Sequence, residues 1–200
     1  MLEWLESRFN VHIQIIHSDN ETALGLEFDE FCKQKHITME QTVPYTPEQN
    51  AIAERSGGVI ILRSRAYIIE SRLPQGLWPE SMKAAVYVLN RTPMKRIDWK
   101  TPFEVFMTAT NGKETKPDIG NLYLFGSRAY IRIEGIPRKE KMLPRAQIGY
   151  LVGYEAHNIW RIWIPKDKKV IRARDCQFDE TRQYDPDEPF ISEIIKQDVP

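Results

Sequence analysis

The order in which the apolar patterns change along this chain constrains its fold more than any other feature. Up to about residue 107, apolar residues fall either at helical spacing or in short extended runs, as in proteins that mix helices with strands. Beyond residue 118 the period becomes two, and turn-forming residues divide the pattern into short pieces. We therefore expect an α/β part followed by a small all-β barrel.

The expected elements follow from these patterns. In the first part we expect helices over 2–9, 27–35, 50–72 and 78–90, strands over 11–17 and 37–43, and a short helix beginning near 99. Pro44 and Pro47 predict a loop before the long helix. In the second part we expect strands over 123–133, 146–154, 159–164 and 169–176. The predicted domains are 1–107, a linker over 108–118, the barrel over 119–180 and an acidic tail over 181–200.

The charges are balanced overall but unevenly distributed. The 200 residues hold 28 Lys and Arg against 28 Asp and Glu. Residues 121–174 hold 12 basic and 4 acidic residues, a local charge of +8, whereas residues 175–200 hold 2 and 8, a local charge of −6. A basic block followed by an acidic tail is typical of a module that binds a polyanion. A solvated barrel surface would explain the same charges.

Several classes of protein are excluded by composition. Cys32 and Cys176 are far apart, and the four histidines form no pair with metal-ligand spacing, so neither a zinc ribbon nor a disulfide framework is expected. No stretch has the apolar length of a membrane span, and the acidic, amphipathic start is unlike a signal peptide. These features predict a protein of the nucleus or cytoplasm without membrane contact.

Two acidic residues stand at the ends of predicted elements. Asp19 follows the first strand, and Glu54 lies near the start of the long helix, with 34 residues between them. Two such carboxylates can converge on a divalent metal ion that serves phosphoryl transfer. Taken singly, each has an ordinary explanation, because an aspartate after a strand often caps a helix and a first-turn glutamate is favoured by the helix dipole.

The long helix combines this glutamate with basic residues and a glycine pair. At 100° per residue, Arg65 and Arg72 return to within about 20° of Glu54 on the helical wheel. One helix face could therefore carry a metal ligand and two cations directed at phosphates. Gly57 and Gly58 each cost roughly 1 kcal/mol in a helix interior, which suggests close approach of another helix or of a phosphodiester backbone.

Residues 17–21 (HSDNE) and 44–55 (PYTPEQNAIAER) surround the acidic pair, and further motifs lie at 77–80, 89–93, 99–104, 124–130, 148–154 and 174–178. Together they resemble the integrase region of copia-type LTR retrotransposon Gag-Pol polyproteins. The motif sequences are most similar to those of the fungal subgroup. The resemblance extends to about residue 185. It implies the later part of a ribonuclease-H-like DDE integrase core, truncated at its N-terminus, followed by a Src-homology-3-like barrel. Glu21 and Ala51 stand where relatives often carry glycine.

This resemblance implies specific roles. Asp19 and Glu54 correspond to the second and third catalytic acids, which in the full-length parent bind Mg²⁺ or Mn²⁺ for DNA strand transfer. The implied partners are DNA, as element ends and target, RNA as an alternative, and further copies of the protein. The candidate nucleic-acid contacts are Tyr45, Gln49, Asn50, Arg55, Arg65, Arg72, Arg161, Lys168, Lys169, Arg172 and Arg174.

The first catalytic aspartate has no candidate in these 200 residues, so the chain alone is expected to be inactive in strand transfer. The bridging ligand of a two-metal site would then be missing. One alternative is a non-catalytic or domesticated module that only binds nucleic acid. Another is a relic that no longer folds stably.

Overall fold

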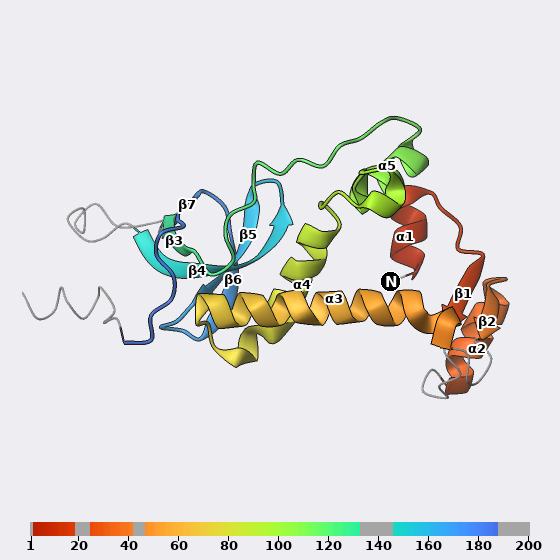
Figure 1. Cartoon of the computed structure of the whole chain (residues 1–200), viewed down its shortest axis with the longest axis horizontal. Coiled ribbons are helices and arrows are strands. Elements are labelled where there is room, and N and C mark those ends of the chain that lie inside the picture. The colour runs from red at the N-terminus through yellow and green to blue at the C-terminus, as the bar shows by residue number, and fades with distance from the viewer. Residues whose placement is uncertain (1, 19–24, 42–46, 133–145, 188–200) are drawn as a thin grey trace, which may run out of the picture. The chain divides into compact units, whose positions relative to one another are not determined.

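The computed structural model describes residues 2–18, 25–41, 47–132 and 146–187. The chain divides into two compact units, of which the first comprises Met1–Val59 and Met94–Lys116, and the second Ile60–Pro93 and Pro117–Pro200. The long helix α3 contributes to both. Each unit is described separately (Figure 1).

The first unit contains a pair of parallel strands joined by a helix. Its opening elements are α1 (Leu2–Phe9), β1 (Ile15–Ser18), α2 (Gly25–Gln34) and β2 (Thr38–Gln41). The two strands pair in parallel, from Ile15 opposite Thr38 to Ser18 opposite Gln41. Parallel neighbours need a crossover connection, which α2 supplies. Cys32 on α2 and Ile37 before β2 are buried, and they give this crossover its apolar contact.

Helix α3 spans Pro47–Ser71 and begins inside the segment that the sequence assigned to a loop. Proline is tolerated in the first turn of a helix because the backbone N–H that it lacks would have no helical partner there. The prediction was therefore wrong for Pro47. Pro44, the other proline from which the loop was predicted, lies outside the described residues.

The first unit also contains the short 3-10 helix η3 (Lys95–Ile97) and α5 (Pro102–Asn111). Thr101 and Glu104 form a reciprocal capping box at the start of α5, and both side chains are buried. Phe106 of α5 meets Phe9 of α1 edge to face, with ring centroids 5.0 Å apart. Helix α5 runs into the stretch predicted as a linker, and Gly112 ends it with a φ of 67°.

The second unit packs helices against an antiparallel sheet. It contains the C-terminal part of α3, the 3-10 helix η2 (Gln75–Leu77) and α4 (Trp78–Leu89). The sheet has five strands in the order β6-β5-β4-β3-β7. Their bounds are β3 Arg128–Arg132, β4 Ala146–Ala156, β5 Ile159–Ile164, β6 Lys169–Ala173 and β7 Cys176–Asp179.

Both faces of this sheet are buried at its centre. Alternate residues such as Leu151 and Ile162 join an apolar cluster within the β domain. Val152 and Trp163, their neighbours in the chain, point to the other face and join a cluster with Leu73 before α4. Burial on both faces explains why β4 and β5 are apolar at nearly every position. The expected fold class, an α/β part followed by a small all-β domain, is confirmed.

Several strands differ from their predicted bounds. The strand predicted over 11–17 begins only at Ile15. The strand predicted over 123–133 begins only at Arg128, because Gly126 adopts a φ of 86° in a turn. The strand predicted over 169–176 divides into β6 and β7, and Asp175 between them has a φ of 57°. Within the described residues, no helix is both long and apolar enough to cross a membrane.

Candidate functional site

The first unit brings two chain segments with predicted site residues to one edge of the parallel pair. Ser18 is the last residue of β1 and lies opposite Gln41, the last residue of β2. Asp19 therefore follows the carboxyl end of one strand, and the segment leading into α3 follows the carboxyl end of its neighbour. In α/β sheets, ligand sites are commonly built at this edge.

The side chains of the predicted centre lie mostly outside the described part of the chain. Asp19 and Tyr45 fall in segments that the structure does not describe. Gln49, Asn50 and Glu54 lie in the first turns of α3, but the structure describes only their place in the helix. The proposed meeting of Asp19 and Glu54 therefore stays a prediction.

The basic residues predicted on α3 have different surroundings. Arg55 and Arg65 lie within the helix and are exposed. Arg72 lies one residue beyond the helix, with a φ of 55°, so helical spacing no longer sets its direction. The wheel position predicted for Arg72 assumed a helix that continues through it. That assumption was wrong.

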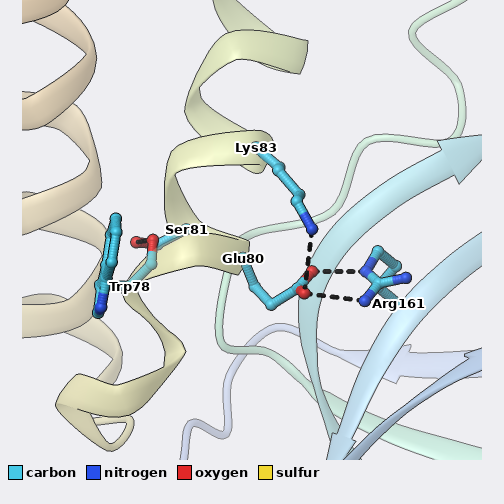
Figure 2. Close-up of polar contacts among 5 residues, drawn as sticks. All are labelled: Trp78, Glu80, Ser81, Lys83 and Arg161. Carbon is cyan, nitrogen blue, oxygen red and sulfur yellow. Dashed lines mark hydrogen bonds and ion pairs between the residues drawn. The ribbon is translucent and has the colours of Figure 1, made fainter. Parts of the chain in front are cut away.

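In the second unit, Arg161 of β5 is engaged with Glu80 of α4 (Figure 2). Its Nη2 donates to Glu80 Oε1 at 2.8 Å, and its Nε donates to Glu80 Oε2. Lys83 Nζ approaches Glu80 Oε1 at 3.5 Å from one turn further along α4. The Glu80 side chain is only 12% exposed and that of Arg161 is 27% exposed, so this ion pair is partly shielded from water.

The environment of Glu80 favours its charged form. Hydrogen bonding to Arg161 lowers the pKa of Glu80, against the opposing effect of burial, and the positive charges of Arg161 and Lys83 add to the lowering. The same hydrogen bond raises the pKa of Arg161. Both groups are therefore charged at neutral pH, and Arg161 has its hydrogen bonds directed at a carboxylate.

A pair of serines fixes the helix that carries Glu80. The hydroxyls of Ser64 on α3 and Ser81 on α4 are hydrogen-bonded, and both side chains are buried. Ser81 also donates to the carbonyl of Trp78 at 2.9 Å (Figure 2). These contacts hold the first turn of α4 in place beside the sheet and so set the position of Glu80.

The remaining predicted cations of the β domain fall into two groups. Arg172 is paired with Glu155 at 2.8 Å, and Arg174 is paired with Asp175 at 3.3 Å. Lys168 lies in the turn before β6 and Lys169 begins that strand; both are exposed, and neither forms an ion pair with another described residue. The two lysines are therefore the cations of this set best placed to meet a phosphate.

Sequence reasoning missed Glu80 as the partner of Arg161. The two residues are 81 positions apart, so no local periodicity could connect them. The available signal was a glutamate in the first turn of a predicted apolar helix, which has many ordinary explanations. Among the described residues, no group of three or more His, Cys, Asp or Glu side chains could hold a metal ion.

Comparison with known proteins gives these sites a context. Residues 127–193 match the family model of the retroviral polymerase SH3-like domain. The retrovirus-related Pol polyprotein from transposon TNT 1-94 of Nicotiana tabacum is 36% identical over 158 residues, which cover 78% of this chain and 11% of the relative. The retrovirus-related Pol polyprotein from transposon RE1 of Arabidopsis thaliana is 30% identical over 129 residues, which cover 63% of this chain and 8% of the relative.

Among solved structures, the catalytic core domain of BIV integrase is similar with a TM-score of 0.41 and 22% identity, covering 56% of this chain and 70% of that one. The chain spans 11% and 8% of the lengths of the two transposon polyproteins, so it matches one segment of each. Over most of its length, this chain is homologous to a segment of retrotransposon Pol polyproteins, and it includes the region of their SH3-like domain.

Proposed function

We propose that this chain belongs to the integrase region of a copia-type retrotransposon Pol polyprotein, of the fungal subgroup, and serves metal-dependent joining of DNA strands. One observation carries the proposal. The last residues of the parallel strands β1 and β2, Ser18 and Gln41, lie opposite each other, and Asp19 and the segment leading into α3 follow them in the chain. Glu54 then follows in the second turn of that helix.

The two acids have the right donor chemistry for a divalent cation. Carboxylate oxygens are the ligands that Mg²⁺ and Mn²⁺ prefer, and Asp19 and Glu54 would supply them. The bound metal would supply the positive charge that activates a water or a 3′-hydroxyl and stabilises the leaving oxygen. Gln49, Asn50 and Tyr45 would orient the DNA end beside these acids.

The proposed partners are DNA, as element ends and as target, and further copies of the protein, in the nucleus or cytoplasm. Arg55 and Arg65 are exposed on α3, and Lys168 and Lys169 are exposed in the β domain. Exposed cations can displace counterions from a nucleic-acid backbone and so bind it in a salt-dependent manner.

Strand transfer by the integrase region that contains this chain tests the proposal. A labelled DNA end and target DNA are incubated with Mg²⁺ or Mn²⁺. Asp19→Asn and Glu54→Gln should each reduce joining to background, since each removes a charged metal ligand. Glu70→Gln is the matched control, because Glu70 is exposed on the same helix and should be dispensable. Joining at the wild-type level by Glu54→Gln would contradict the assignment.

A second candidate function is binding of nucleic acid without catalysis, carried by the β domain. Lys168 and Lys169 are exposed and form no ion pair with another described residue, which favours this function. Lys168→Gln with Lys169→Gln should weaken DNA binding and lower its dependence on salt concentration. An unchanged affinity between low and moderate salt for the wild-type chain would exclude this mode.

A further inference from the structure

The segment Met94–Lys100, which precedes α5 in the first unit, is a closed and ordered loop. Met94 N donates to the carbonyl of Lys100, and Trp99 N donates to the carbonyl of Met94, both at 3.0 Å. Lys100 N in turn donates to the carbonyl of Ile97 at 3.0 Å. The buried capping box of Thr101 follows at once. The backbone of this loop is therefore fixed at both ends.

The loop holds two consecutive residues in an unfavourable backbone conformation. Asp98 has a φ of 53° and Trp99 a φ of 60°, in the left-handed region that residues other than glycine rarely adopt. Each such residue costs roughly 1–2 kcal/mol. Neither of these two positions is occupied by glycine. Backbone strain of this kind clusters at active sites, ligand clamps and switch regions.

The side chain presented is a tryptophan. Trp99 is 69% exposed, more than Trp4 or Trp78, the other exposed tryptophans among the described residues. A large aromatic ring held open to water on a fixed backbone loses little conformational entropy when it binds a flat partner. The ring therefore provides a preformed stacking surface.

The same loop carries three cations. Lys95, Arg96 and Lys100 are exposed and form no ion pair with another described residue. With Asp98, the loop has three positive charges and one negative charge. An apolar protein pocket would have to desolvate these cations. A nucleic acid would instead offer phosphates to the cations and a base to the ring.

We propose that Met94–Lys100 binds single-stranded nucleic acid, with Trp99 stacked on an unpaired base and Lys95, Arg96 and Lys100 against the neighbouring phosphates. This combination of an aromatic platform and a basic surface binds single strands with little sequence preference. A blunt duplex keeps its bases stacked and offers no free face to Trp99. The inference rests on the proposed function for nucleic acid as the partner, and it adds an unpaired stretch of the substrate as the feature recognised.

The test is fluorescence anisotropy of the 200-residue chain with a labelled oligothymidylate of about 16 nucleotides, and with a blunt duplex of the same length. Trp99→Ala should weaken single-strand binding about 5- to 150-fold, the range expected for loss of one base stack, and leave duplex binding unchanged. Trp99→Phe should retain most of the affinity. Trp78→Ala, which removes a ring that is 58% exposed in the second unit, is the matched control and should bind normally.

The contribution of the cations is measured separately, through the salt dependence of binding. Lys95→Gln and Arg96→Gln should each reduce the slope of log affinity against log salt by about 0.7, whereas Trp99→Ala should leave the slope unchanged. Circular dichroism melting of each variant checks that the fold is retained.

Equal single-strand affinity of Trp99→Ala and wild type would overturn this inference while leaving DNA as a partner. Equal losses on single strand and duplex would also overturn it, because base stacking would not be the cause. Trp99-dependent binding to vesicles with anionic lipids, not displaced by oligothymidylate, would assign the loop to a membrane instead and overturn it as well. The proposed function fails separately, through strand transfer that survives Glu54→Gln.

Discussion

The carboxylate of Glu80 in α4 accepts two hydrogen bonds from the guanidinium of Arg161 in β5. The pair ties a helix to a sheet within the second unit, beside the apolar cluster that contains Trp163. The N–H groups on Nε and Nη2 of Arg161 are thereby directed at a carboxylate and not at a phosphate. Arg161 therefore differs from Lys168 and Lys169, which are exposed and remain the better candidates for binding DNA.

Glu80→Gln should destabilise the second unit. The amide keeps the shape of the carboxylate but removes its charge, so two charge-assisted hydrogen bonds are lost or weakened beside the Arg161 side chain, which is 27% exposed. We expect the free energy of unfolding to fall by about 1–2 kcal/mol, because partial exposure of Arg161 lowers the cost of leaving it unpaired. Urea denaturation at neutral pH measures this change.

Glu155→Gln is the control for that prediction. Glu155 pairs with Arg172 in a more exposed setting, so its loss should change the free energy of unfolding by less than about 0.5–1 kcal/mol. A double-mutant cycle of Glu80→Gln with Arg161→Gln should show a favourable coupling energy. Equal effects of Glu80→Gln and Glu155→Gln would show that partial burial of the Glu80 pair is of no consequence.

The stabilisation by Glu80 should depend on pH. Because the pKa of Glu80 is lowered in the folded state, its contribution is fully present above the ordinary glutamate pKa of about 4.3 and is lost as the pH falls through the lowered folded value. The stability difference between wild type and Glu80→Gln should therefore be constant near neutral pH and shrink below about pH 4.3. Urea titrations at a series of pH values measure it. A difference that persists unchanged into acid would refute this origin.

Local patterns predicted most of the elements because helices and strands follow from short-range periodicity. The helices predicted over 2–9 and 78–90 and the strand predicted over 159–164 appear with bounds within one residue of those expected. In the β domain, errors arose where one residue leaves the common backbone regions. Gly126 and Asp175, both with positive φ, end or interrupt strands whose side-chain alternation continues past them.

The site was less accessible to sequence reasoning for a different reason. Chain order places Asp19 directly after β1 and Glu54 in the helix that follows β2, so the prediction that the two acids meet could be made from the sequence. Ion-pair partners such as Glu80 and Arg161 depend instead on how α4 lies on the sheet, which no local pattern encodes. The loop that presents Trp99 was also missed, because a tryptophan gives no sequence signal for the left-handed conformation that Trp99 adopts.

The glycines of α3 and of the turn before β3 should respond oppositely to alanine. Nothing lies within 4 Å of a Cβ placed at Gly57 or Gly58, so no packed helix in the described part of the chain explains them. Gly58→Ala should raise the free energy of unfolding by about 1 kcal/mol through helix propensity alone. At Gly126, with a φ of 86°, a Cβ would overlap the Cβ of Ser71.

Gly126→Ala should therefore lower the free energy of unfolding by about 2 kcal/mol or more, from backbone strain and the steric overlap together. Thermal melting of the two variants and the wild type shows whether Gly58→Ala raises stability and Gly126→Ala lowers it. Destabilisation by Gly58→Ala would show that α3 needs a close backbone approach that this chain alone does not make. Reduced DNA affinity of a stabilised Gly58→Ala would indicate that a phosphodiester backbone makes that approach.

Tyr184 should prove to be part of the folded second unit, although the sequence places it in an acidic tail from residue 181. Its ring meets Tyr150 and Trp163 edge-on, with centroids 5.2 and 5.1 Å apart, at the apolar cluster between helices and sheet. Tyr184→Ala removes both contacts and should lower the free energy of unfolding by about 1–3 kcal/mol. Tyr184→Phe keeps the ring and should be nearly neutral. Urea denaturation compares them. Unchanged stability of Tyr184→Ala would mean that this segment contributes nothing to the fold, and the β domain would then end at β7.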